Sequence, residues 1–249
     1  MAGGQGGRGG QPDKQKISDR GGQVYVEDPF AGTLRIIAVN LLASFTFRRP
    51  IFESLKKLDP KVQMDNIHGI ITTSDGNSLG NKLISAINSR LHETKDKIVI
   101  VESLKGSHID PVDRTRASNG SGTGSVVYIN IDDNAPDTLQ DEKTKELHNE
   151  KTPLEIAVGH ELIHALHMAN GVSDDRRNEY RFTLIYKENG ETKEEQKAIG
   201  ADFPYEEAKT TGLGEYKDEE FTENSLRKEL RALEKKEDNK KKYDERVTY

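Results

Sequence analysis

Residues 152–171 carry the clearest pattern of apolar and polar positions in the chain, and the pattern has the period of an α-helix. With about 100° of rotation per residue, Ile156 and three histidines fall within one narrow sector: His160, His164 and His167. The apolar residues gather on the opposite side: Leu154, Val158, Leu162, Ala165, Leu166 and Ala169. Such a helix packs its apolar side into a core and presents its histidines to a cleft.

Both ends of this helix are marked in the sequence. Thr152 suits the N-cap position, Pro153 suits the first helical position, and Glu155 completes a capping box with Thr152. Asn170-Gly171 predicts a left-handed end.

The other apolar runs predict a core built from helices and strands. Segment 24–58 is too short and too close to Arg48-Arg49-Pro50 for a membrane span, so we expect it to add a strand or helix to the core. Further patterns predict strands at 69–74, 97–102 and 125–131, a helix at 79–91, and a loop at 107–124. The chain is thus predicted to form one α+β domain over residues 23–249.

Composition narrows the classes of function. Residues 1–22 are rich in glycine without apolar periodicity, so they are predicted to be disordered. They lack the apolar segment of a Sec signal peptide, and they suit a type III secretion signal as any flexible tail would. The absence of cysteine excludes disulfides, thiolate metal sites and cysteine nucleophiles. A net charge of −6 argues against nucleic acid as the main partner.

The histidine side of the predicted helix contains the motif His160-Glu161-Leu162-Ile163-His164, or HExxH. Its spacing places two imidazoles one turn apart, where both can reach one zinc ion. Glu161 lies about 100° from that line, where a carboxylate can take a proton from the attacking water and pass it to a leaving amine. The motif predicts a zinc hydrolase with Glu161 as general base.

A catalytic zinc site needs a third protein ligand. The metzincin pattern would require glycine at 167 and histidine at 170, where this chain has His167 and Asn170. His167 lies two turns from the first histidine, so we expect it to line the cleft or orient a ligand. The better candidates are Glu206 and Glu207, in a short helix predicted at 204–212. Adjacent residues point about 100° apart, so only one can face the metal, and spacing leaves both open.

Four elements in one order carry a resemblance to a known family: HELIHALHMANG at 160–171, EEAKTTG at 206–212, FTEN at 221–224 and RVTY at 246–249. Together they resemble the NleD-like family of type III effector zinc metalloproteases, and they are similar to elements of the catalytic light chains of clostridial neurotoxins. The resemblance implies a zincin-like α+β fold, in which the active-site helix packs under a small mixed sheet.

Residue by residue, the resemblance implies His160, His164 and Glu207 as ligands of one Zn²⁺ per chain, and Glu161 as the general base. Glu223 matches an acidic residue that orients a ligating histidine.

The resemblance also extends to the C-terminal segment. Arg246 and Tyr249 match the pair that positions the scissile carbonyl and stabilises the developing oxyanion. Glu223 and Arg246 are farther apart than in typical relatives, so Tyr243 competes with Tyr249 as the phenol, and a frayed polar tail is a further interpretation. Thr222 as the N-cap of a helix through Leu233 would bring this segment back towards the cleft.

The strand predicted at 125–131 precedes the histidine helix in the sequence. In zincin-type peptidases, a strand at the edge of the sheet above the active-site helix pairs with the extended substrate. Residues 126–130 are our candidate, and an ordinary internal strand explains the same pattern.

We therefore expect a zinc endopeptidase, secreted by a bacterium and acting in the cytoplasm of a host cell. By resemblance it cleaves a host signalling protein, with mitogen-activated kinases as the family precedent. We expect a monomer with a protein substrate, and neither nucleic acid nor membrane as partner. Three other classes stay open: a catalytically inactive binding module, a protease domain of an interbacterial or polymorphic toxin, and a non-proteolytic zinc hydrolase.

Overall fold

The computed structural model describes residues 23–26, 37–64, 70–133, 135–174, 176, 179–199 and 205–248. At 23–26, 37–46, 70 and 199 the backbone alone is described. Segment 1–22, predicted to be disordered and a possible secretion signal, and Tyr249 both lie outside these residues.

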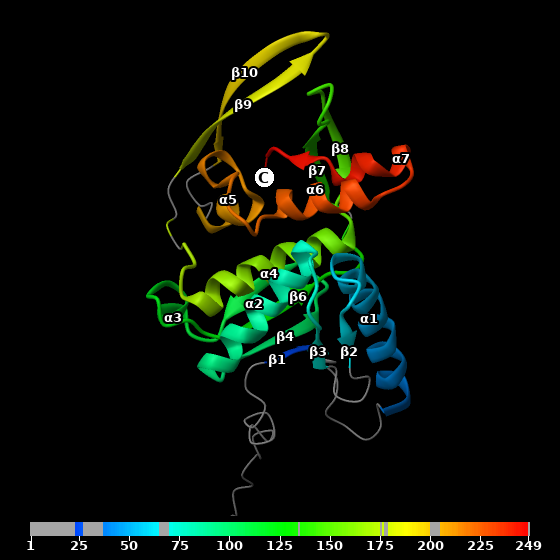
Figure 1. Cartoon of the computed structure of the whole chain (residues 1–249), viewed down its shortest axis with the longest axis vertical. Coiled ribbons are helices and arrows are strands. Elements are labelled where there is room, and N and C mark those ends of the chain that lie inside the picture. Colours follow the sequence, from blue (N-terminus) through cyan, green and yellow to red (C-terminus); the bar gives the residue numbers. More distant parts are fainter. Residues whose placement is uncertain are drawn as a thin grey trace, which may run out of the picture.

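A mixed six-stranded sheet forms one side of the molecule (Figure 1). Its strands lie in the order β2 (Gln63–Met64), β3 (Ile70–Thr72), β1 (Gln23–Val26), β4 (Lys97–Glu102), β6 (Ser125–Ile129) and β5 (His108–Pro111). The β1–β4 and β4–β6 pairs are parallel, and the other pairs are antiparallel. Three of these strands, β3, β4 and β6, confirm the strands expected near 69–74, 97–102 and 125–131.

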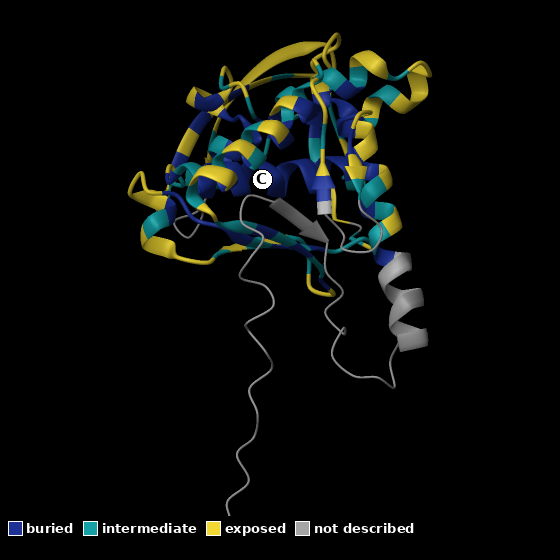
Figure 2. Cartoon of the chain, turned by 60° about the horizontal axis from the view of Figure 1, so that its bottom comes forward, coloured by how far each residue is buried: buried dark blue, intermediate teal, exposed yellow. Residues whose placement is uncertain are grey.

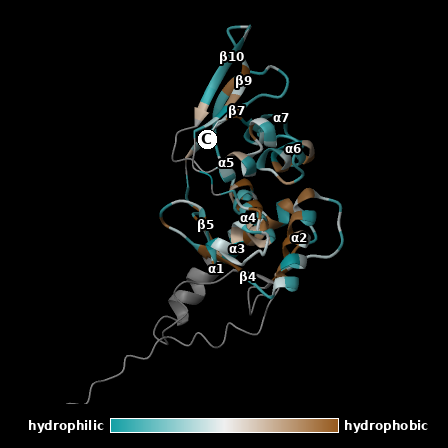
Figure 3. Cartoon of the chain, turned by 90° about the vertical axis from the view of Figure 1, so that its left-hand side faces the viewer, coloured by the Kyte–Doolittle hydropathy of each residue, from teal (hydrophilic) through white to brown (hydrophobic). Residues whose placement is uncertain are grey.

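The histidine helix, α4 (Leu154–Asn170), packs on β5 and β6 and is flanked by α1 (Ile37–Leu58) and α2 (Leu79–Thr94). The main apolar core lies between these helices and the sheet, and it includes Ile51, Leu55, Leu83, Ile87, Ile98, Ile100, Val127, Ile129, Leu162 and Ile163. In Figure 3, α2 carries both hydrophobic and hydrophilic residues, as expected of a helix with one side in the core. The expected α+β class is confirmed, with the candidate active-site helix packed against a mixed sheet.

Most of the remaining elements lie on the other side of α4 (Figure 1). They comprise α5 (Tyr205–Thr211), η2 (Gly214–Tyr216), α6 (Glu223–Leu233), α7 (Glu237–Lys240), η3 (Lys241–Tyr243), a sheet in the order β11 (Glu245–Arg246), β7 (Pro136–Gln140), β8 (Leu147–Lys151), and a hairpin of β9 (Tyr180–Glu188) and β10 (Glu191–Ile199). A second apolar cluster joins the base of this hairpin to α5 and the C-terminal segment: Tyr180, Phe182, Leu184, Ala208, Leu213, Tyr216 and Val247. As a result α4 is covered on both sides, and every residue from Val158 to Ala169 is buried (Figure 2).

The two ends of α4 differ in how well the sequence predicts them. Gly171 ends the helix in the left-handed conformation, with φ of 71°, as predicted. The predicted N-terminal cap is wrong, because Pro153 occupies the N-cap position without a side-chain cap. The Thr152 hydroxyl instead donates to Asp137 Oδ2 at 2.6 Å, and Glu155 accepts a hydrogen bond from Lys57 Nζ.

Two expectations for residues 107–131 are also wrong. The predicted loop 107–124 contains strand β5 and the short helix α3 (Arg114–Ser118), whose N-cap is Asp113. Strand β6, which covers most of the proposed substrate-binding edge 126–130, is internal because β4 pairs with one side of it and β5 with the other. The edge strand beside α4 is β5.

Among the helices of the described residues, none combines the length and the apolar character that a membrane crossing requires.

Candidate metal centre

Three helices bring together the predicted metal ligands and Glu223, which is predicted to orient one of them. The histidines lie on α4, the two adjacent glutamates on α5, and Glu223 begins α6. A Cβ atom at Gly159 would lie only 2.6 Å from Leu226 Cδ1, so glycine beside His160 permits a close approach of α6 to α4. Thr222 caps α6 as predicted, accepting a hydrogen bond from the Ser225 N–H, and this fixes where Glu223 enters the site.

The two histidines of the motif converge with Glu207. His160 Nε2 and His164 Nε2 lie 3.0 Å apart, and Glu207 Oε2 lies 3.1 Å from each of them. His160 and His164 are buried and Glu207 is partly exposed. Among the described residues, these three form the one group of three or more histidine, aspartate or glutamate side chains close enough to hold a metal ion.

Each histidine of the pair contacts a further carboxylate through its other ring nitrogen. His160 Nδ1 donates to Glu223 Oε2 at 2.8 Å, and His164 Nδ1 donates to Glu206 Oε1 at 3.2 Å. A proton held on Nδ1 leaves the lone pair on Nε2, which faces the centre of the cluster. The two adjacent glutamates therefore have different positions. Glu207 faces both Nε2 atoms, and Glu206 contacts the opposite nitrogen of His164.

The charges of the cluster are strongly coupled. Burial alone would lower the pKa of His160, but its hydrogen bonds with Glu207 and Glu223 outweigh burial and raise that pKa to about 9. Burial would raise the pKa of Glu207, but the charge of His164 and hydrogen bonds with both histidines hold it well below its ordinary value. Protons therefore compete with any cation for this centre.

The donor set fits a zinc ion. Two imidazole nitrogens and one carboxylate oxygen are a set found in catalytic zinc sites, and such sites keep a fourth position open for water or substrate. Three electron-rich atoms about 3 Å apart repel one another unless a cation or proton lies among them, and His160, His164 and Glu207 hold their atoms at 3.0 to 3.1 Å.

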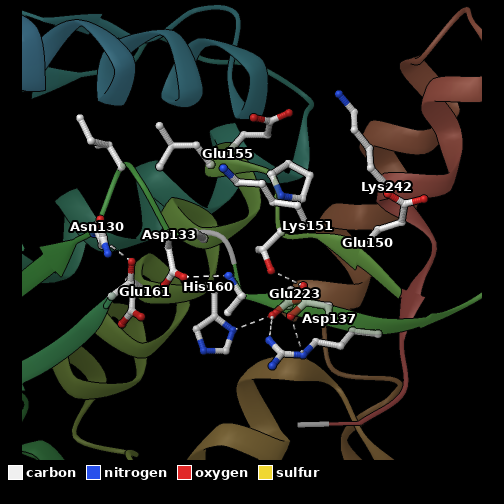
Figure 4. A pocket seen from close by; sticks show the side chains of 18 of the residues that line it. Asn130, Asp133, Asp137, Glu150, Lys151, Glu155, His160, Glu161, Glu223 and Lys242 are labelled. Atoms are coloured by element: carbon white, nitrogen blue, oxygen red, sulfur yellow. Dashed lines mark hydrogen bonds and ion pairs between the residues drawn. The ribbon is translucent and has the colours of Figure 1, made fainter. Parts of the chain in front are cut away.

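Glu161 lies beside the cluster and at the end of a cleft of about 710 Å³ (Figure 4). Its Oε2 atom is buried and has no hydrogen-bond partner among the described residues. Burial raises the pKa of this carboxyl group, although the charges of His160 and His164 act in the opposite direction. The cleft is also lined by Ser107, which precedes β5, and by Arg246.

Two backbone contacts fix the position of Arg246 at the cleft. Strand β11 pairs with β7, and the backbone N–H of Arg246 donates to Asn224 Oδ1 at 2.7 Å. The Arg246 guanidinium contacts Glu223 Oε2 at 3.2 Å and Asp137 Oδ1 at 3.4 Å. The structure therefore brings Arg246 to Glu223, the carboxylate that accepts from His160. The Thr222 helix cap was predicted from the sequence, and the pairing of β11 with β7 was not.

The other candidates have different surroundings. His167 Nδ1 donates to Glu206 Oε1 at 2.6 Å, so His167 contacts the same carboxylate as His164 and does not face the cluster. Tyr243 is buried and its hydroxyl donates to Glu155 Oε1, which occupies the phenol away from the histidine pair. Tyr249 lies outside the described residues.

Sequence reasoning missed two residues of the network around the site. It offers Glu206 only as an alternative ligand, whereas in the structure Glu206 accepts a hydrogen bond from His164 Nδ1. Asp137 and Arg227 join the network around Glu223 and were not singled out. The four-residue spacing of Glu223 and Arg227 on a capped helix was the available signal, since residues so spaced lie on one face of a helix.

The chain was compared with curated proteins and with solved structures. A search of curated proteins found no match. Among solved structures, the chain is similar to the botulinum neurotoxin type C light chain in its apo, zinc-removed form, with 12% identity and a TM-score of 0.32 over 60% of this chain and 31% of that one. It is also similar to the type D light chain, with 13% identity and a TM-score of 0.37 over 82% and 49%. The chain thus spans half or less of the length of these light chains.

A family model described as an effector protein, peptidase M91, matches residues 67–238. The match includes the HExxH motif, both adjacent glutamates and Glu223, and it ends before Arg246. It confirms the family resemblance that the four sequence elements predicted. The chain belongs to the peptidase M91 family of effector proteins.

Proposed function

We propose that this protein is a zinc-dependent endopeptidase in which His160, His164 and Glu207 hold the metal. The observation that carries the proposal is the convergence of two Nε2 atoms and one carboxylate oxygen beside Glu161, whose buried Oε2 atom has no hydrogen-bond partner among the described residues. Family membership supports peptide-bond hydrolysis as the reaction. Residues 23–249 would form one catalytic unit.

A zinc ion held by these ligands would polarise the scissile carbonyl and lower the pKa of a water molecule. Glu161 takes the proton of the attacking water and delivers it to the leaving amine, a role for which burial and a raised pKa suit its carboxyl group. Arg246 donates hydrogen bonds from the side of the cleft and stabilises the developing oxyanion, with Tyr249 as the second donor by family resemblance.

We assign substrate pairing to the free side of β5. Val112 N–H bonds to Gly124 C=O, and pairing alternates along an antiparallel ladder, so Ile109 directs its N–H and C=O away from β6. No other described strand pairs with that side of β5. Pro111 lacks a donor, which limits the ladder to a short stretch of substrate.

Replacing Ile109 by proline removes this outward N–H, while Ile109→Ala keeps it and loses the same partly buried side chain. One hydrogen bond contributes about 0.5–1.5 kcal/mol, so we expect kcat/KM of the proline variant to be about 2- to 10-fold below that of the alanine variant. Equal values in steady-state assays would argue against pairing at β5.

Membership of an effector family supports the proposed substrate and setting of the reaction. We propose that the protein acts as a monomer in the cytoplasm of a host cell, after bacterial secretion, and cleaves a host signalling protein of the mitogen-activated kinase type. A type III route is the proposed means of delivery.

The test combines metal analysis with cleavage. We expect one zinc per purified chain and zinc-dependent cleavage of a mitogen-activated kinase, absent with an unrelated protein of similar size. Glu161→Gln is the matched control, because it removes the base and leaves the three ligands in place. Substoichiometric zinc together with unchanged stability after chelation would refute a metalloprotease and favour an inactive binding module.

A further inference from the structure

Arg227 is the largest side chain that is fully buried in the described residues, and its exposed fraction is 0%. It lies on α6, four residues after Glu223. A buried guanidinium is costly unless every donor finds a partner. The hydrogen-bond partners of Arg227 therefore indicate the role of its charge.

The guanidinium of Arg227 contacts three separate parts of the chain. Nε donates to Glu223 Oε1 at 2.7 Å, Nη2 donates to Asp137 Oδ2 on β7, and Nη1 donates to the C=O of Lys242 at 2.9 Å. One planar side chain thereby joins the start of α6, a strand of the small sheet and the segment that leads into β11.

Both carboxylates that bind Arg227 also contact proposed machinery of the site. Glu223 uses its other oxygen, Oε2, to accept from His160 Nδ1 at 2.8 Å and from Arg246 at 3.2 Å. Asp137 faces Arg246 through Oδ1 at 3.4 Å. The close-up view shows Glu223 and Asp137 side by side next to His160 (Figure 4).

We propose that Arg227 is a positioning residue that couples the metal centre to the oxyanion side of the cleft. The inference rests on the proposed function. The hydrogen bond from Arg227 orients Glu223 so that its Oε2 atom faces His160. The positive charge of Arg227 also compensates part of the negative charge of Glu223 and Asp137, and Arg246 compensates the rest. With Arg227 replaced, two buried carboxylates would compete for Arg246 and draw it out of the cleft, and His160 would lose a fixed acceptor.

The variant Arg227→Met removes the guanidinium and keeps a long apolar side chain. We expect its zinc dissociation constant to rise by about 10–100-fold, the range for losing support behind a metal-ligating histidine. At saturating zinc, kcat should fall at least several-fold while KM changes little, because Arg246 acts on the transition state. Arg227→Lys should give intermediate values, since an ammonium offers one point charge in place of the planar fork.

The matched control is Arg231→Met, one turn along the same helix. Arg231 pairs with Asp244 and Glu142, outside the network of Glu223 and Asp137. The substitution therefore removes a salt-bridged arginine and leaves the contacts of the site in place. Zinc affinity is measured by competition with a chromogenic chelator, kcat and KM by peptide cleavage, and folding by circular dichroism.

A folded Arg227→Met variant with the zinc affinity and kcat of Arg231→Met would overturn the inference. If Arg227→Met does not fold, Arg227→Lys decides by the same two measurements, and wild-type values there overturn it equally. Absence of zinc binding by the wild-type protein would refute the proposed function. A wild-type zinc protease whose Arg227 variants are unchanged would refute this inference alone.

Discussion

Alanine at position 207 and alanine at position 206 should weaken the metal centre by different amounts. Glu207→Ala removes the oxygen that lies 3.1 Å from both Nε2 atoms, and so removes a direct ligand. Glu206→Ala removes the acceptor of His164 Nδ1 at 3.2 Å, but the Thr210 hydroxyl remains 3.0 Å from that nitrogen and can accept its hydrogen bond. The substitution at 206 therefore leaves His164 partly oriented.

The magnitudes follow from these contacts. Loss of a group that orients a ligand costs about 10–100-fold in metal affinity, and we place Glu206→Ala near the lower end, about 1.4 kcal/mol, because Thr210 compensates. Glu207→Ala should exceed the upper end of that range. Glu206→Ala should also destabilise the fold by roughly 1–3 kcal/mol, because it leaves the buried donor His167 Nδ1 without its acceptor, and by less for the partly buried Asp174 N–H.

Zinc titration of the metal-free variants in competition with a chromogenic chelator measures the first effect, and urea unfolding of the same samples measures the second. The assignment would be refuted if Glu206→Ala lost more zinc affinity than Glu207→Ala. It would also be refuted if Glu206→Ala bound zinc as tightly as the wild type, since Glu206 would then give His164 no support.

The remaining predictions concern the base, the phenol and the pH dependence. Glu161→Gln should keep zinc and lower kcat by about 10²–10⁴-fold, as loss of a general base does, and retained turnover would remove Glu161 from that role. Tyr249→Phe should lower kcat by about 10²-fold or more. Tyr243→Phe should leave kcat unchanged and lower the free energy of unfolding, because the Tyr243 hydroxyl binds Glu155. If peptide cleavage and urea unfolding gave the reverse pattern, Tyr243 would be the phenol that stabilises the oxyanion. The pKa of His160 is raised to about 9 in the metal-free site, so zinc binding at pH 7 should release protons and affinity should rise as pH increases towards 9; calorimetry in buffers of different ionisation enthalpy that found no release would contradict this.

The parts of the site that depend on spacing within one element could be predicted from the sequence. The HExxH spacing places both histidines on one side of α4, and a threonine N-cap marks the start of α6. Adjacent positions on α5 point in different directions, which predicts that one of Glu206 and Glu207 faces the cluster. Which one does so depends on the rotation of α5 against α4, and that is set by packing between segments far apart in the chain.

The order of the strands in the six-stranded sheet could not be predicted from the sequence for a related reason. β5 has only four residues, and the alternation of exposed His108 and Asp110 with the apolar Ile109 and Pro111 is too short to distinguish it from a polar loop. β6 has the β-branched pattern of a strand, but periodicity records how a strand faces its sheet and not which strands flank it. The edge beside α4 could be assigned only once β5 was seen to pair with β6.

A long charged stretch separates Glu223 from Arg246, and the structure shows why its length is a poor guide to the position of Arg246. The stretch continues α6, turns through α7 and η3, and returns as β11, which pairs with β7. What fixes Arg246 is this pairing together with Asn224, whose side chain bonds to both the N–H and the C=O of Arg246. A frayed tail is therefore the wrong interpretation for Arg246, because its place depends on where the chain returns and not on how many residues it uses to do so.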